Sequence, residues 1–161
     1  MSEAEEQAKP IPFIDVTGRQ IIGTIIVGIM TGLVSWGLAV LLGEYVLEGI
    51  FCQAMMTEQC AATAGYSRGA GMVLATILAV FALVKLQVYR PLLVGVCVMV
   101  SLWGIAAVLM MLPVHLAAML FAGLFGAAYL AFMWIARLRS FGMALVLMIV
   151  MVVVVRLALN S

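Results

Sequence analysis

Charge is scarce in this sequence. Charged residues make up 9% of the 161 residues, whereas an average soluble domain carries about 25%. Hydrophobic residues make up 67%, and a soluble fold of this length has too little interior to bury them. The net charge is +1 and no run of Lys and Arg is present, so the electrostatic footprint of a nucleic-acid-binding protein is missing. The composition excludes a soluble fold and a nucleic-acid partner, and it predicts a membrane protein.

Groups that carry chemistry are also scarce where a membrane enzyme or pump would need them. No Asp or Glu lies inside an apolar run, so a proton relay across the membrane is not predicted. His115 is the single histidine, and the sequence offers neither a second haem ligand nor a partner that would tune it. No Ser–His or Asp pair for intramembrane hydrolysis is present. We therefore expect no enzymatic activity, no cofactor and no metal.

Long apolar runs are what the sequence does contain. They are Ile21–Leu42, Gly69–Val84, the stretch Pro91–Ala136 and Phe141–Leu157. As one helix, Pro91–Ala136 would be about 69 Å long at 1.5 Å per residue, more than twice the hydrocarbon thickness of about 30 Å. It must therefore fold back, and Pro113 in the segment 112–115 is the expected hairpin turn. The sequence predicts an all-α, polytopic helical bundle with five transmembrane helices.

The ends of the runs carry recognisable signals. Thr17 and Gln20 have the spacing of a capping box before the first run, and Gly43 is its expected C-cap. Ser67 is the expected N-cap of the second run and Ser140 that of the fifth.

The Lys and Arg residues indicate how the chain is threaded. With the N-terminus inside, the inner segments carry six of them and the outer segments two. The inner ones are Lys9, Arg19, Lys85, Arg90, Arg137 and Arg139, and the outer ones are Arg68 and Arg156. The positive-inside rule then predicts an N-inside, C-outside protein of a bacterial inner membrane. We expect Arg156 to snorkel to the outer interface.

Four of the inner cations bracket the two inner turns; they are Lys85, Arg90, Arg137 and Arg139. Their main expected role is topology, and membrane lipid headgroups or an acidic partner are the ligands that suit them.

The expected organisation is a cytoplasmic tail, 1–18, and a single transmembrane domain, 19–161, with an outer loop at 44–68. The loop holds Cys52 and Cys60, and the oxidising outer side favours a disulfide between them. A redox pair or a metal site is disfavoured because the spacing is not Cys-x-x-Cys and no histidine is near. Cys97, in the third run, is expected to be a small buried hydrophobe.

Small residues line one face of two runs. The first run has Thr24, Gly28, Gly32, Ser35 and Ala39 in steps of three or four, and the fourth has Ala118, Ala122 and Gly126. Such faces let helices approach closely. We expect one face to pack within the chain and the other against another subunit.

The N-terminal tail is acidic and then apolar. Its acidic start is unlike a secretory signal peptide, so we expect no cleavage. The prolines around Ile11, Phe13 and Ile14 favour an extended segment that docks onto a partner, with simple membrane contact as the alternative.

These features predict a non-catalytic integral membrane subunit that packs against other membrane proteins in a larger assembly, of the secretion, conjugation or energy-transducing type. The alternative is a small homo-oligomeric transporter, channel or lipid-handling protein. Its pore or groove would be lined by Thr24, Thr31 and Ser35, with Ser101.

Overall fold

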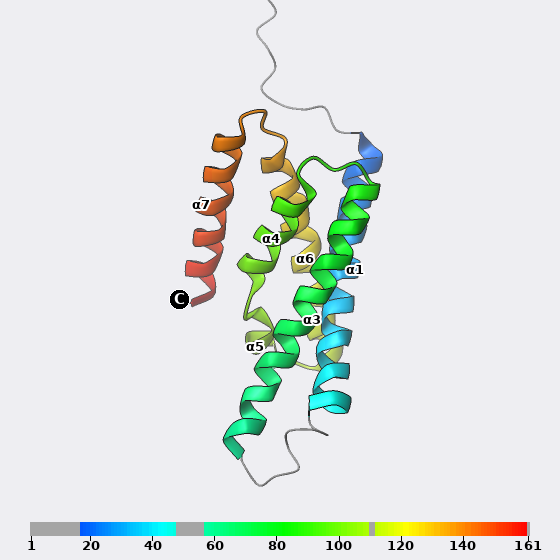
Figure 1. Cartoon of the computed structure of the whole chain (residues 1–161), viewed down its shortest axis with the longest axis vertical. Coiled ribbons are helices and arrows are strands. Elements are labelled where there is room, and N and C mark those ends of the chain that lie inside the picture. Colours follow the sequence, from blue (N-terminus) through cyan, green and yellow to red (C-terminus); the bar gives the residue numbers. More distant parts are fainter. Residues whose placement is uncertain (1–16, 48–56, 110–111, 161) are drawn as a thin grey trace, which may run out of the picture.

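The computed structural model describes residues 17–47, 57–109 and 112–160. They form helices joined by short turns, which confirms the all-α membrane bundle. The elements are α1 (Gly18–Leu41), the π-helical η1 (Leu42–Leu47), α3 (Thr57–Lys85), α4 (Pro91–Leu102), α5 (Ile105–Leu109), α6 (Val114–Ala136) and α7 (Phe141–Asn160). In Figure 1, α1, α4 and α7 begin at the same end of the bundle, where α3 and α6 end. We call this the N-terminal end.

Four described segments are long and apolar enough to cross a membrane. They are Gly18–Val46, Gly65–Lys85, Val114–Ala136 and Phe141–Ala158. The third pass is different, because α4 has only 12 residues and is followed by the separate helix α5. Four of the five predicted passes are therefore helices of spanning length, whereas the third is a broken helix.

Local signals explain where several helices begin. The Thr17 backbone N–H donates to Gln20 Oε1 at 3.2 Å, which confirms the capping contact before α1. The Ser140 hydroxyl accepts from the Met143 N–H at 3.4 Å in the first turn of α7. Pro113 is the N-cap of α6, so the hairpin lies where it was predicted. Pro91 begins α4, a position that needs no N–H donor.

Two expected caps are wrong. Gly43 lies inside η1, because the chain continues past α1 as a π-helix instead of stopping. Ser67 lies inside α3, which begins at Thr57, and its side chain is buried. Tertiary contact explains both positions, since a Cβ on Gly43 would lie 3.5 Å from Ser67 Oγ. The expected loop 44–68 is consequently helical at both of its ends.

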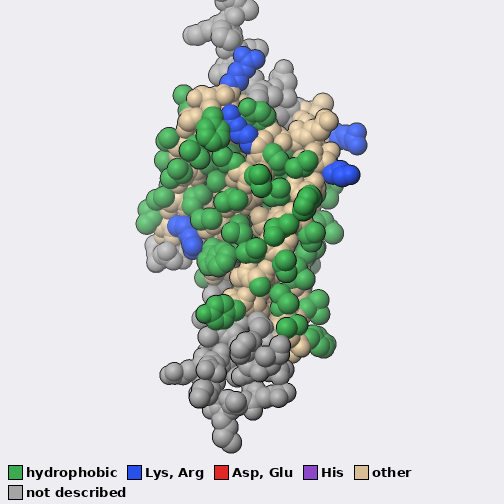
Figure 2. All heavy atoms as spheres, viewed as in Figure 1, with side chains coloured by type: hydrophobic (Ala, Val, Ile, Leu, Met, Phe, Trp, Pro, Cys, Tyr) green, Lys and Arg blue, Asp and Glu red, His purple; other side chains and the backbone are tan. Residues whose placement is uncertain are grey.

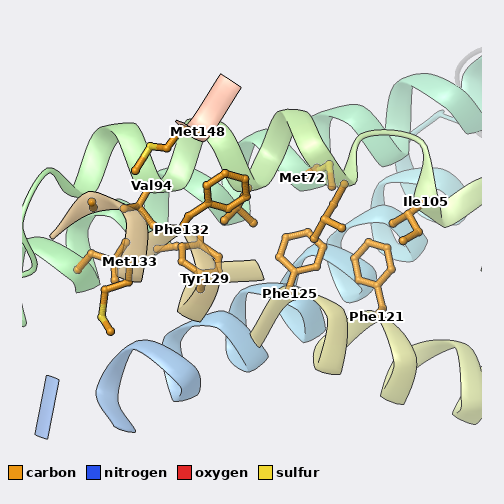
Figure 3. Packing of buried hydrophobic residues seen from close by; sticks show 14 of the residues in the cluster. Met72, Val94, Ile105, Phe121, Phe125, Tyr129, Phe132, Met133 and Met148 are labelled. Atoms are coloured by element: carbon orange, nitrogen blue, oxygen red, sulfur yellow. The ribbon is translucent and has the colours of Figure 1, made fainter. Parts of the chain in front are cut away.

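α6 is the centre of the bundle. It contacts α1, α4, α5 and α7. Its aromatic side chains project into the interior, where Figure 3 shows them beside residues of α3, α4 and α7. Phe125, Tyr129 and Phe132 are fully buried. The Phe121 and Phe125 ring centroids lie 4.9 Å apart, a separation typical of packed aromatic pairs.

α7 lies at the edge of the bundle (Figure 1) and packs on α4 and α6. Only 11% of its membrane-spanning window is buried, against 44% for α6. Its buried contacts come from Ala144 and Met148. Most of α7 is therefore open to lipid or to another protein.

Candidate functional site

The two small-residue faces predicted from the sequence meet each other. A Cβ on Gly28 would lie 2.8 Å from the Cα of Gly126, and one on Gly32 would lie 2.8 Å from the Cα of Ala122. The backbones of α1 and α6 are therefore in direct van der Waals contact. The sequence predicted that one of these faces packs against another subunit. The structure differs, because the two faces pack against each other within the chain.

The small-residue face of α1 also packs against α3. A Cβ on Gly71 of α3 would lie 2.9 Å from the backbone N of Ala39 and 3.1 Å from the carbonyl O of Ser35. Gly71 has no counterpart among the predicted packing residues. Ala118, in the first turn of α6, is only half-buried. The small residues thus build a three-helix core of α1, α3 and α6.

Threonine hydroxyls in this core are occupied by their own helices. Thr24 donates to the Gln20 carbonyl at 2.7 Å and Thr31 donates to the Val27 carbonyl at 2.6 Å. Such bonds to the carbonyl four residues earlier satisfy a hydroxyl without a partner helix. Thr24, Thr31 and Ser35 are at most 5% exposed, so the face that was expected to line a pore is covered within the chain.

Two other hydroxyls are buried without such a bond. Ser101 Oγ on α4 has no hydrogen-bond partner among the described residues. Tyr129 Oη on α6 makes no hydrogen bond of full geometry but interacts with the Thr31 hydroxyl of α1. Leaving a buried hydroxyl unpaired costs about 1–3 kcal/mol. Ser101 Oγ is thus a buried polar atom for which the described residues supply no partner.

The break between α4 and α5 is the main feature that the sequence reading missed. Gly104 has φ +91°, a conformation that suits glycine and ends the helix after Leu102. The freed carbonyl of Trp103 accepts a hydrogen bond at 2.6 Å from Nη1 of Arg156 on α7. A cation is favourable at the C-terminal end of a helix, where the backbone carbonyls are unpaired.

The break and Arg156 lie at similar depth. Trp103 follows Pro91 by about 18 Å of helix, and Arg156 follows Phe141 by about 22 Å, at 1.5 Å per residue. Both values are smaller than the hydrocarbon thickness of about 30 Å. Arg156 therefore reaches a backbone carbonyl that lies at a similar distance along the bundle. The expectation that Arg156 snorkels to the outer interface stays a prediction.

One signal in the sequence could have indicated this pairing. Gly104 follows a tryptophan within an otherwise apolar run, and Arg156 lies at a matching distance from the start of the last run. A backbone break within an apolar run needs a hydrogen-bond donor, and Arg156 is the long cationic side chain that supplies one.

Cations gather at the N-terminal end (Figure 2). The Arg90 guanidinium lies between two rings, 4.6 Å from the centroid of Tyr89 and 4.9 Å from that of Phe141. Arg137 lies over the ring of Trp134 at 4.7 Å, so it too is held by an aromatic ring. Lys85 and Arg139, the other two predicted headgroup residues, are exposed at the same end.

Several predicted residues lie outside what the structure describes. They are Ile11, Phe13 and Ile14 of the tail, Cys52, and the side chain of Cys60. The disulfide and the tail therefore stay predictions. Cys97 is half-buried with a free thiol, and its Sγ lies 3.8 Å from Met148 Sδ of α7. Within the described ranges, no three His, Cys, Asp or Glu side chains form a metal-binding group.

We compared the chain with known protein families, curated proteins and solved structures. The chain matches no protein-family model, no curated protein and no solved structure.

Proposed function

We propose that this chain is a non-catalytic integral membrane subunit that packs against other membrane proteins in a larger inner-membrane assembly, of the secretion, conjugation or energy-transducing type. The observation that supports this proposal most directly is the arrangement of α7. It is an apolar helix of 20 residues that packs on the bundle along one side only, and its other sides are exposed. A second membrane helix can pack there without displacing any contact that the described residues make with α7.

The bare side of α7 has the spacing of a helix-packing face. Val146, Val150, Val154 and Leu157 recur in steps of four and three, and each is between 52% and 66% exposed. Val and Leu at this spacing present a continuous ridge to a neighbouring helix. By contrast, Ala144 and Met148 point the other way and are fully buried.

The alternative, a small homo-oligomeric transporter or channel, receives less support. It needs the hydroxyl face of α1 to be open to a pore or to a second copy. Thr24 and Thr31 are instead buried and bonded to their own helix. A glycine contact as close as that between Gly28 and Gly126 also leaves no room for solute between α1 and α6.

The test is extraction in mild detergent followed by identification of stoichiometric membrane partners. The variant Val150→Phe places a bulkier apolar side chain on the bare face of α7, and it should reduce co-purification at least several-fold. Leu78→Phe is the matched control, because Leu78 is 59% exposed on α3 and away from α7. Retention of the same partners by both variants would contradict docking on α7. A homo-oligomer that conducts ions or moves solute in liposomes would overturn the proposal itself.

A further inference from the structure

Arg156 on α7 is a cation whose charge no described residue balances. The Trp103 carbonyl that accepts from its Nη1 is a neutral group, so this bond leaves the positive charge of the guanidinium in place. Among the described residues, no Asp or Glu forms an ion pair with Arg156. Glu44, the acidic residue whose side chain is described, belongs to η1, which packs on α1 and α3. Cations in membrane helices typically pair with an acidic group.

The guanidinium of Arg156 also has donors to spare. Nη1 is the atom that bonds to Trp103, whereas Nε and Nη2 bond to no atom of the described residues. Neither of these two is a buried atom without a partner, so both are accessible at the surface of the described bundle. A guanidinium edge of this kind can bind a carboxylate through two parallel hydrogen bonds.

Arg156 lies at the border between the packed side and the exposed side of α7. It follows Val152, which packs partly against the core, by four residues, and Val153, which is 49% exposed, by three. Positions three or four apart share a helix face, so Arg156 lies beside both. Ile149, seven residues before Arg156, is 54% exposed on the same face. A helix that packs on the exposed side therefore comes within reach of the guanidinium.

The bond to Trp103 determines where the charge lies. Nη1 is 2.6 Å from the Trp103 carbonyl oxygen and would be 4.0 Å from a Cβ on Gly104, so the guanidinium lies against the break after α4. The Trp103 ring in turn packs on α3, where a Cβ on Gly69 would lie 3.3 Å from it. A side chain that is already held in one place loses less freedom on binding, which favours affinity.

We propose that the membrane helix that packs on α7 carries an Asp or Glu whose carboxylate pairs with Nε and Nη2 of Arg156. This inference rests on the proposed function, because it describes the partner that docks on the same helix. The carboxylate supplies the missing negative charge and accepts the hydrogen bonds that the Trp103 carbonyl leaves unused. A partner with apolar side chains alone would cover Arg156 and leave its charge unbalanced, which is unfavourable.

The experiment measures how the purified full chain binds a model membrane helix in phosphatidylcholine liposomes. The helix has about 20 Leu and Ala residues, with one Glu at the depth of Arg156, and the matched helix has Gln at that position. Association is followed by energy transfer between fluorescent labels. A tag after Ser161 keeps the chain's own terminal carboxylate away from Arg156. The Glu helix should bind about tenfold more tightly, within the range that interhelical polar contacts give in model peptides.

Variants of the chain assign this preference to one side chain. Arg156→Gln should abolish the preference for the Glu helix, and Arg156→Lys should keep part of it, because Lys retains the charge without the planar fork. Arg68→Gln is the matched control, since Arg68 is the other cation predicted on the outer side but lies on α3. It should leave the preference unchanged. Far-ultraviolet circular dichroism of all variants establishes that they are folded.

Equal binding of the Glu and Gln helices by the unmodified chain would overturn the ion pair. Val150→Phe distinguishes this result from a failure of the proposed function, because it should weaken both helices alike. If it does so while the two helices bind equally, docking on α7 stands and the ion pair does not. If neither helix binds, both are contradicted. Loss of the Glu preference on adding phosphatidylglycerol would assign Arg156 to lipid phosphate and would also overturn the inference.

Discussion

Gly28 and Gly32 allow α1 and α6 to approach closely because they have no side chain. In a bilayer, helices gain little from leaving lipid, so their association depends on close van der Waals contact. The 2.8 Å approach that a Cβ on either glycine would make to α6 means that α1 and α6 touch along their backbones. At this scale the important property is volume rather than chemical reactivity.

A single added methyl group should therefore be costly at Gly28. We expect Gly28→Ala to destabilise the folded chain by about 1–3 kcal/mol, because α1 and α6 must separate to admit the Cβ. The measurement is the unfolding midpoint in detergent under increasing denaturant. Gly37→Ala is the control on the same helix, since a Cβ at Gly37 meets nothing within 4 Å. Equal stability of the two variants would show that the interface is loose.

The residues of this interface were predictable, but their partner was not. Helical spacing placed Thr24, Gly28 and Gly32 on one face from the sequence alone, since 3.6 residues per turn determine which positions align. Nothing in that spacing distinguishes a partner helix of the same chain from one of another chain. The contact with Gly126 is a property of the folded bundle.

At the scale of helices, α7 is the least buried of the four membrane-spanning helices. Ala144 and Met148 supply its buried apolar contacts, and Arg156 supplies its hydrogen bond to Trp103. That bond also stabilises the break between α4 and α5, whose backbone would otherwise face apolar surroundings unpaired. One side chain thus connects the last helix to the irregular part of the third pass.

Loss of this side chain should affect both elements. We expect Arg156→Met to destabilise the chain by about 1–3 kcal/mol, because the Trp103 carbonyl loses its donor. Hydrogen exchange followed by mass spectrometry should show faster exchange in α7 and in residues 101–106 than in α6. Arg156→Lys keeps a cationic donor and should lose less. If Arg156→Met leaves the exchange of α7 unchanged, the bond is not what holds this helix.

The described bundle as a whole has a strong asymmetry of charge. Arg19, Lys85, Arg90, Arg137 and Arg139 all lie at the N-terminal end of the described bundle. Lys and Arg are more frequent in the cytoplasmic segments of membrane proteins than in the outer ones. This rule predicts that the N-terminal end of the bundle faces the cytoplasm. The apolar side chains that cover the bundle along its length (Figure 2) are consistent with lipid on its outside.

This orientation predicts the result of terminal fusions. A phosphatase that is active only outside the cytoplasm should be active when fused after Ser161, and a fluorescent protein that folds only inside should be dark there. The same two reporters placed before Met1 should give the opposite pattern. Fluorescence from the C-terminal fusion would mean that α7 does not cross or that the whole bundle is inverted.

The sequence by itself determined the solvent, the all-α class of the fold and the position of the hairpin at Pro113. Long uncharged runs are stable only in a bilayer, and a run of about 69 Å cannot cross it once. The tertiary structure alone decided which faces meet, where the third pass breaks and what Arg156 binds. Those outcomes depend on side chains that are distant in sequence, such as Gly28 with Gly126 and Arg156 with Trp103. Local periodicity carries no information about such pairs, because it describes one helix at a time.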